Sequence, residues 1–219
     1  MPDEAERSVA DKVQQEFSQF PLRTYPKGQI LVFAEENPDH IFYLVKGQVR
    51  QYDVSYRGDE VTINVFKPSA FFPMSWAINH TPNAYFYKTE QPTDVYIVPS
   101  DKAVAFLKDN PDVLFDLLSR VYRGLDGLLG RMVHLMSGTA KSRLLYELII
   151  ECRRFGKTSE YGCLLSASEV DLASRSGLSR ETVSREMKKL KESGLVQLKA
   201  EGILIPDCQA LETILGTTI

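Results

Sequence analysis

Charged and polar side chains recur at helical spacing in one short segment near the C-terminus. At about 100° per residue, five of them fall on one side of a predicted helix, namely Arg180, Glu181, Ser184, Arg185 and Lys188. Arginine can donate two hydrogen bonds to guanine O6 and N7, and glutamate can accept one from cytosine N4. This face could therefore read base edges in the major groove of DNA. A solvated helix surface with a Glu181–Arg185 ion pair would show the same pattern.

Two short helices joined by a glycine-containing turn are predicted to position this face. Ser166, followed three residues later by Glu169, forms a capping-box pattern that predicts the start of the first helix. That helix is expected to run through Arg175, with Val170 and Ala173 on one face. Two helices around such a turn are typical of a helix-turn-helix, although any helical hairpin with a glycine turn looks similar.

The second helix is predicted to lie between Ser179, its N-cap, and Gly194, the residue after its end. An apolar stripe on this helix should pack into a core, and it consists of Val183, Met187 and Leu190. Two short apolar runs after Gly194 predict a small hairpin of the kind that forms the wing of a winged helix-turn-helix. Because wings commonly contact phosphates, Lys199 in this hairpin is a predicted DNA-backbone contact.

The N-terminal half of the chain has a different pattern. Short runs rich in Val, Ile, Tyr and Phe recur between residues 26 and 99, and turn-forming residues separate them. The predicted strands are Gln29–Phe33, Ile41–Lys46, Val49–Val54, Val61–Phe66, Tyr85–Thr89 and Val95–Val98. Many short strands at this spacing predict an antiparallel barrel or jelly roll.

A long helix is predicted between these two regions, from Asn110-Pro111-Asp112 to Ser137-Gly138-Thr139. Its apolar residues alternate at three- and four-residue spacing, which is typical of a coiled-coil seam: Leu118, Val121, Leu125, Leu128, Met132 and Leu135. A helix packed on its own domain remains an alternative explanation. Three glycines lie on the same segment, and the sequence alone does not determine their role: Gly124, Gly127 and Gly130.

The composition limits the classes of protein to which the chain can belong. Its 219 residues suffice for one large or two small domains, and its net charge of −3 excludes a uniformly basic nucleic-acid coat. No apolar run approaches membrane-spanning length and no signal peptide is visible, which predicts a cytoplasmic protein without membrane contact. The cysteines, Cys152, Cys163 and Cys208, are too few and too scattered for a disulfide framework or a four-cysteine iron–sulfur cluster.

Several segments together resemble the cyclic-AMP receptor protein and fumarate–nitrate regulator (CRP/FNR) family. Residues 165–196 are similar to its DNA-binding segment, and residues 179–185, Ser-Arg-Glu-Thr-Val-Ser-Arg, match its recognition-helix motif closely. Residues 43–49 resemble the strand–Lys-Gly–strand of its β-roll, and residues 110–112 the start of its dimerisation helix. The resemblance covers almost the whole chain. It implies a homodimeric transcription regulator that binds double-stranded DNA, and RNA polymerase if it is an activator.

The resemblance also implies an α+β fold in three parts. Residues 1–110 would form a cyclic-nucleotide-binding-like β-roll, a double-stranded β-helix or jelly roll that acts as the sensor domain. Residues 111–138 would form the dimerisation helix, and residues 139–219 the C-terminal winged helix-turn-helix domain that binds DNA.

The resemblance assigns roles to the residues of the recognition helix. Arg185 and Glu181 would read one G·C pair and Arg180 a second guanine, within an inverted repeat whose half-sites share a TGA-like core. Ser184 replaces the glycine of the cyclic-AMP receptors and is similar to the fumarate–nitrate type, in which a serine contributes to base reading. Predicted contacts to the DNA backbone come from Ser179, Thr182, Lys188 and Lys199.

The residues with which the family binds cyclic nucleotides are missing. A Gly-Glu pair for the ribose and an Arg-Ser pair for the cyclic phosphate are both absent between Phe71 and Ala84. A buried cyclic phosphate would lack its charged partner, so cyclic AMP and cyclic GMP are not expected as effectors. No N-terminal cysteine cluster is present for an iron–sulfur centre. Haem sensors of the family bind the haem through an N-terminal proline and a histidine. Pro2 is present here, but Ser75 stands near the position of that histidine. No haem, metal or other cofactor is therefore predicted.

Apolar and aromatic residues are the remaining candidates for an effector pocket. A small pocket for an unknown small molecule could be lined by Phe72, Met74, Trp76, Tyr85 and Tyr87. The same residues could equally fill a closed core, in a regulator that is controlled only by its abundance. A different class of protein also fits the sequence, namely an effector-binding or enzymatic β-barrel whose helical tail serves only assembly. Sequence-selective, salt-dependent DNA binding would distinguish the two classes.

Overall fold

The computed structural model describes residues 4–56 and 58–216. Its chain divides into two compact units, Met1–Tyr122 and Arg123–Ile219, whose boundary falls inside the long helix α4 (Pro111–Ser137). Pro2, which was considered as a haem ligand, lies outside the described residues. Among the described helices, none combines the length and the apolar character needed to cross a membrane.

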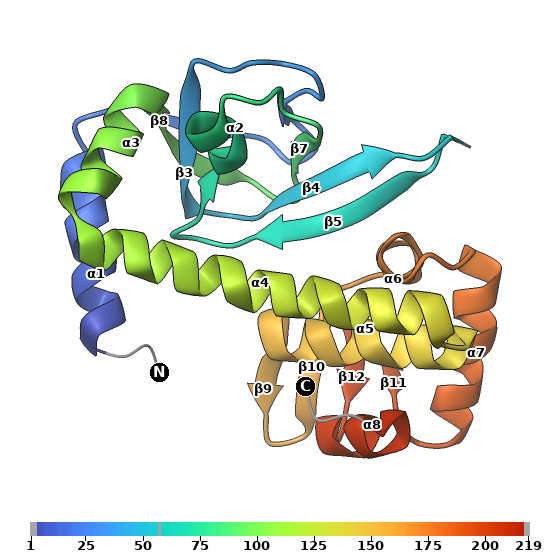
Figure 1. Ribbon diagram of the computed structural model, residues 1–219. Coiled ribbons are helices and arrows are strands. Elements are labelled where there is room, and N and C mark those ends of the chain that lie inside the picture. The colour runs from blue at the N-terminus through green and yellow to red at the C-terminus, as the bar shows by residue number, and fades with distance from the viewer. Residues whose placement is uncertain (1–3, 57, 217–219) are drawn as a thin grey trace. The chain divides into compact units, whose positions relative to one another are not determined.

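Two antiparallel sheets form the first unit (Figure 1). One has the strand order β1-β8-β3-β6 and the other the order β2-β7-β4-β5. The strands are β1 (Leu22–Tyr25), β2 (Ile30–Val32), β3 (His40–Lys46), β4 (Val49–Val54), β5 (Glu60–Phe66), β6 (Phe71–Phe72), β7 (Phe86–Thr89) and β8 (Thr93–Pro99). Every predicted strand is present, with ends that shift by at most two residues. The predicted jelly-roll type of fold is therefore confirmed, whereas β1, which precedes the predicted strand region of residues 26–99, and the two-residue strand β6 were not predicted.

Alternation along β3 explains how the first unit builds two cores. Phe42 and Leu44 point into a cluster between the two sheets, and Ile41 and Tyr43 point into a second cluster on the other face of β3. Helices α1 (Glu4–Phe17), α2 (Met74–Asn79) and α3 (Ser100–Asp109) contribute to that second cluster, together with the start of α4. Phe17 of α1 is fully buried there, against the rings of Tyr43 and Phe71. Neither α1 nor α2 was predicted.

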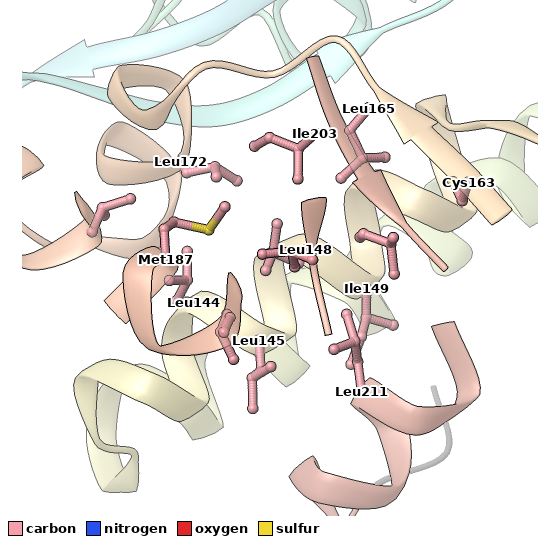
Figure 2. Packing of buried hydrophobic residues seen from close by; sticks show 14 of the residues in the cluster. Leu144, Leu145, Leu148, Ile149, Cys163, Leu165, Leu172, Met187, Ile203 and Leu211 are labelled. Carbon is pink, nitrogen blue, oxygen red and sulfur yellow. The ribbon is translucent and has the colours of Figure 1, made fainter. Parts of the chain in front are cut away.

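The second unit is built around helix α5 (Ala140–Phe155). Its side chains Leu144, Leu145, Leu148 and Ile149 are fully buried in one apolar cluster (Figure 2). The other elements are β9 (Lys157–Ser159), β10 (Gly162–Leu165), α6 (Glu169–Ser176), α7 (Arg180–Glu192), β11 (Gln197–Lys199), β12 (Gly202–Ile205) and α8 (Cys208–Leu215). The strands form one antiparallel sheet of order β11-β12-β10-β9. The predicted helix-turn-helix and the predicted wing, β11 with β12, are both present.

The predicted start of α6 is wrong by two residues. Its N-cap is Ser168 rather than Ser166, because Leu165 still pairs with Ile203 in the sheet. Ser168 Oγ accepts a hydrogen bond from Asp171 N at 3.2 Å, and Asp171 Oδ2 accepts one from Ser168 N at 2.8 Å, which completes a capping box.

Only one side of α6 faces the core. Val170 is 57% exposed whereas Ala173 is buried, so only part of the face that these two residues share is packed. Leu172 and Ala173 are the residues that face the core.

Candidate nucleic-acid interface

The orientation of α7 is set by its cap and by its apolar stripe. Ser179 Oγ accepts a hydrogen bond from Thr182 N at 3.2 Å, which confirms the predicted N-cap. Gly194 follows the end of the helix with a φ of +75°, as predicted. The side chains of the stripe, Val183, Met187 and Leu190, are each at most 2% exposed, so the opposite side of the helix must face solvent.

The side chains that were predicted to read bases share this solvent-facing side. Arg180, Glu181, Ser184 and Arg185 are all exposed, and so is Lys188. Within residues 4–56 and 58–216, neither Arg180 nor Arg185 forms an ion pair. The alternative of a surface held by a Glu181–Arg185 ion pair therefore has no support in the geometry. The guanidinium groups are free to bind an external acceptor.

The helix N-terminus keeps Glu181 ready to accept hydrogen bonds. Its own backbone N–H and the Ser179 hydroxyl donate to the carboxylate, and together with the nearby Arg180 charge they hold the pKa of Glu181 below its usual range. The side chain is thus an anion at neutral pH, which is the form that accepts a hydrogen bond from an amino group.

The predicted backbone contacts lie around the same helix. Lys188 on α7 and Ser179, the N-cap of that helix, are exposed, and Thr182 is half-buried. The hydroxyl oxygens of Ser179 and Thr182 lie 3.1 Å apart. Lys199 ends strand β11 and is exposed at the tip of the wing, where it pairs with Gly202. The turn before α7 needs Gly177, whose φ of +63° is left-handed and disfavours residues with a side chain.

Helix α4 carries a long apolar surface. Five of the six predicted seam residues are between 37% and 56% exposed, namely Leu118, Val121, Leu125, Leu128 and Met132. Leu135 differs because it is half-buried, and its side chain approaches Gly177 in the turn between α6 and α7. Single chains rarely leave so many large apolar side chains in water without a partner surface.

One of the three glycines of α4 has a clear packing role. A Cβ atom at Gly130 would collide with the Tyr146 hydroxyl, whereas Cβ atoms at Gly124 and Gly127 would meet nothing within 4 Å. Tyr146 is buried, and its hydroxyl donates a hydrogen bond of 3.0 Å to the Gly127 carbonyl oxygen. Gly130 therefore lets α5 approach the second half of α4.

Charged residues that were not singled out in the sequence hold the helices of the second unit together. Arg131 of α4 donates two hydrogen bonds to the buried carboxylate of Glu147 on α5. One turn further along α5, Glu151 pairs with Arg175 of α6. Glu147 lies within the largely apolar run Leu144–Ile150, and Glu151 follows it directly. Acidic residues at buried helical positions are the signal that could have revealed these pairs.

The predicted pocket residues of the first unit are divided between its two cores. Phe72 and Tyr87 are buried between the sheets, where their rings stack with centroids 5.3 Å apart, and Tyr85 packs against the same cluster. Burial raises the pKa of Tyr87, and its hydroxyl accepts a hydrogen bond from Gln51. Met74 and Trp76, both on α2, pack against the other cluster. The five side chains are thus not brought together around one space.

Comparisons with known proteins cover both units. Residues 22–110 match the family model of the cyclic nucleotide-binding domain, and residues 142–214 match that of the Crp-like helix-turn-helix domain. The global nitrogen regulator of Synechocystis sp. is 24% identical over 87% of this chain and 86% of its own. The cyclic AMP receptor protein of Thermus thermophilus is 24% identical over 93% of this chain and 92% of its own.

Solved structures show the same fold. The structure of the global regulator CLP of Xanthomonas campestris aligns with this chain at a TM-score of 0.78 and 16% sequence identity. The alignment covers 90% of this chain and 99% of the CLP chain. FixK2 of Bradyrhizobium japonicum covers 91% and 98% with a TM-score of 0.75 at 20% identity. The relatives are transcription regulators rather than enzymes, which excludes the enzymatic β-barrel. With one family model on the sheet unit and another on the helix-turn-helix, the chain belongs to the CRP/FNR family of DNA-binding transcription regulators.

Proposed function

We propose that this regulator acts as a homodimer on an inverted-repeat operator whose half-sites share a TGA-like core. The observation that carries the proposal is the exposed face of α7, on which Arg180, Glu181 and Arg185 have no ion-pair partner among the described residues. Arg185 takes the guanine and Glu181 the cytosine of one base pair, and Arg180 or Ser184 reads the flanking pair. Ser179, Thr182, Lys188 and Lys199 contact the DNA backbone.

The exposed seam of α4 supports the homodimer. Burial of apolar surface contributes about 25 cal/mol per Å², so pairing Leu118 to Met132 with the same residues of a second copy removes this surface from water at a net gain. A two-fold dimer presents two α7 helices to half-sites about one helical turn, or ~34 Å, apart. In this proposal residues 111–138 carry the dimer seam, residues 1–110 form the sensor domain and residues 139–219 form the DNA-binding domain.

Replacing Leu125 with arginine tests the dimer. An unpaired charge at the centre of the seam costs several kcal/mol, about 3–5 by analogy with broken buried pairs, so Leu125→Arg should sediment as a monomer at micromolar concentration. Asp126→Asn makes the same change in net charge on an exposed neighbouring position and should leave the dimer intact. A fully dimeric Leu125→Arg variant would show that α4 is not the interface.

Fluorescence anisotropy with matched, single-substituted and random duplexes tests base reading. Arg185→Ala and Glu181→Ala should each weaken the free energy of binding to the matched duplex by about 1–3 kcal/mol per half-site. Both variants should also show a weaker preference at that base pair. Lys199→Ala should weaken binding to all duplexes alike. It should also lower the slope of the logarithm of the binding constant against the logarithm of salt concentration by about one. Arg153→Ala is the control, because it removes the same charge from an arginine of α5 that is paired with Glu212. An equal loss on every duplex for Arg185→Ala would place this side chain on phosphates instead of bases.

We further propose that cyclic AMP and cyclic GMP are not the effectors, and that any effector is another small molecule. The missing Gly-Glu and Arg-Ser pairs support this proposal, and so does the aromatic stack of Phe72, Tyr87, Phe42 and Phe66 between the sheets. This stack occupies the interior with rings that offer no charged partner to a phosphate.

A further inference from the structure

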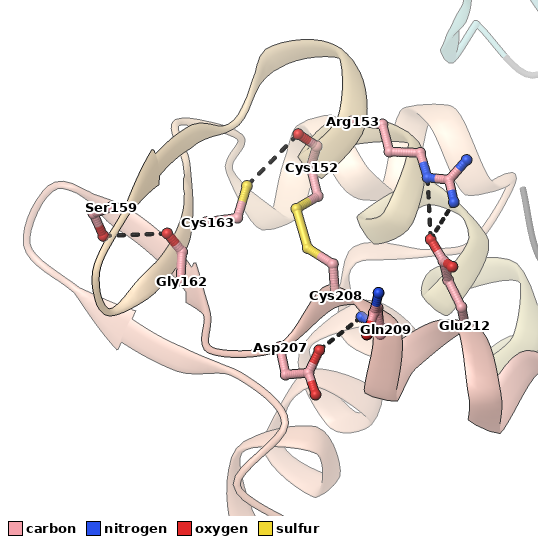
Figure 3. Close-up of a disulfide and its surroundings, with 9 residues drawn as sticks. All are labelled: Cys152, Arg153, Ser159, Gly162, Cys163, Asp207, Cys208, Gln209 and Glu212. Atoms are coloured by element: carbon pink, nitrogen blue, oxygen red, sulfur yellow. Dashed lines mark hydrogen bonds and ion pairs between the residues drawn. A yellow bond between two sulfur atoms is a disulfide. The ribbon is translucent and has the colours of Figure 1, made fainter.

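The chain contains three cysteines, and all of them meet in one cluster of the second unit (Figure 3). Cys152 lies near the end of α5, Cys163 on β10, and Cys208 at the start of α8. The three Sγ atoms all lie within 4.8 Å of one another. Residues that are scattered over 56 positions of the sequence therefore form one concentrated group of sulfur donors.

The local backbone makes room for the cluster. A Cβ atom at Gly156, which ends α5, would collide with the Cys163 sulfur and with the carbonyl oxygen of Cys152. Cys163 is buried, and its thiol donates a hydrogen bond of 3.6 Å to that carbonyl oxygen. Cys152 and Cys208 are joined as a disulfide, with their Cα atoms 7.2 Å apart. The usual Cα separation in a disulfide is about 4.4–6.8 Å, so the backbones of Cys152 and Cys208 stand slightly farther apart than in most disulfides.

We propose that in the reduced protein Cys152, Cys163 and Cys208 together bind one thiophilic metal cation, Zn²⁺. Tetrahedral zinc with Zn–S bonds of about 2.3 Å places its sulfur ligands about 3.8 Å apart, which falls within the span of the cluster. Three protein ligands leave the fourth position to water. The all-thiolate donor set favours Zn²⁺ over Mg²⁺, Ca²⁺ and Mn²⁺, which prefer oxygen ligands. A disulfide by itself would use two of the three sulfurs and would give Cys163 no part.

Two chemical steps separate the disulfide from the metal site. An added thiol or phosphine reductant supplies two electrons, the Cys152–Cys208 bond breaks, and each sulfur takes up one proton. Zn²⁺ then replaces the protons of the three thiols, which are released to the solvent. The metal would join α5, β10 and α8, all of which contribute to the core around Leu148, Ile149 and Leu211 (Figure 2).

Metal binding to reduced, metal-free protein tests the proposal without DNA. Under anaerobic conditions with a phosphine reductant, a Zn²⁺ titration against a chromophoric chelator should give one ion per chain. Co²⁺ should give the thiolate charge-transfer and intense visible bands of a tetrahedral sulfur site. Zn²⁺ should also raise the unfolding temperature and protect all three thiols from alkylation. Protein oxidised to the Cys152–Cys208 disulfide should bind neither ion tightly.

Substitution of Cys163 separates the metal site from a simple disulfide. Cys163→Ser should weaken Zn²⁺ binding by more than about 100-fold, since changes in the second shell alone cost ~10–100-fold. Cys163→Ala serves as a second variant because it places no hydroxyl in the core, and circular dichroism checks that each variant folds. Ser159→Ala is the control, since Ser159 lies on the neighbouring strand β9 and bonds only within that hairpin. Reduced protein that takes up no metal, or uptake that is unchanged in both Cys163 variants, would overturn the proposal.

Discussion

The ion pair between Arg131 and Glu147 connects α4 to α5 inside the second unit, and its removal has a calculable cost. The Arg131 Nε and Nη2 atoms donate to the two carboxylate oxygens of Glu147 at 2.5 Å and 3.0 Å. The Glu147 side chain is only 1% exposed. In the variant Arg131→Met the carboxylate stays buried without its bidentate partner, which typically costs about 3–5 kcal/mol. Arg175 still lies close enough to favour the anion, so we expect the lower end of that range.

A double-mutant cycle in urea separates the pair from the packing around it. Arg131→Met and Glu147→Leu should each destabilise the protein, the first by about 3 kcal/mol. The double variant should lose much less than the sum, because both charges leave and an apolar contact replaces them. All four proteins are compared at one protein concentration, so that any self-association contributes equally. Additive losses would show that the two side chains do not act as a pair.

The pH dependence supplies a second readout of the same cycle. Burial raises the pKa of Glu147 above its ordinary value of 4.5, and Arg131 opposes this rise. Without Arg131 the folded-state pKa rises further, so the folded protein holds a proton that the unfolded chain has released. Stability must then fall as pH increases from about 4.5 to the raised pKa. The decrease in the free energy of unfolding caused by Arg131→Met should therefore be smaller at pH 5 than at pH 8. A decrease that is independent of pH would refute the reasoning.

Three further predictions can be checked with single measurements. Gly130→Ala should destabilise the protein by about 1–3 kcal/mol in urea because its methyl group displaces Tyr146, whereas Gly127→Ala should gain about 0.5–1 kcal/mol. A gain in both variants would contradict the close approach at Gly130. Ser168→Ala should lower the free energy of unfolding, measured by thermal unfolding, by about 0.5–2 kcal/mol. Ser166→Ala should lower it by less than about 0.5 kcal/mol, since only Ser168 caps α6. Calorimetric titration should detect no binding of cyclic AMP or cyclic GMP at micromolar concentration, and a measurable affinity that also tightened DNA binding would contradict the proposed exclusion.

Features that depend on local periodicity could be predicted from the sequence. The strand pattern of residues 26–99, the N-cap Ser179 and the stripe of Val183, Met187 and Leu190 involve neighbours within a few residues of one another. The charged face of α7 follows directly, because a helix that buries one stripe must expose the opposite one. The start of α6 shows the limit of this reasoning. Ser166 with Glu169 matches the usual capping-box pattern, but the pairing of Leu165 with Ile203 extends the preceding strand and Ser168 caps the helix instead.

Features that depend on distant segments were decided only by the tertiary structure. The contact of Gly130 with Tyr146 and the pairing of Arg131 with Glu147 arise from the packing of α5 on α4. The three cysteines meet because α8 returns to the end of α5 beside β10. A residue's type and spacing carry information about its own helix or strand, whereas the partner across the core depends on how the whole chain closes. Buried charges and sulfur clusters are therefore assigned by the fold, because only the fold brings together the groups that neutralise or bind one another.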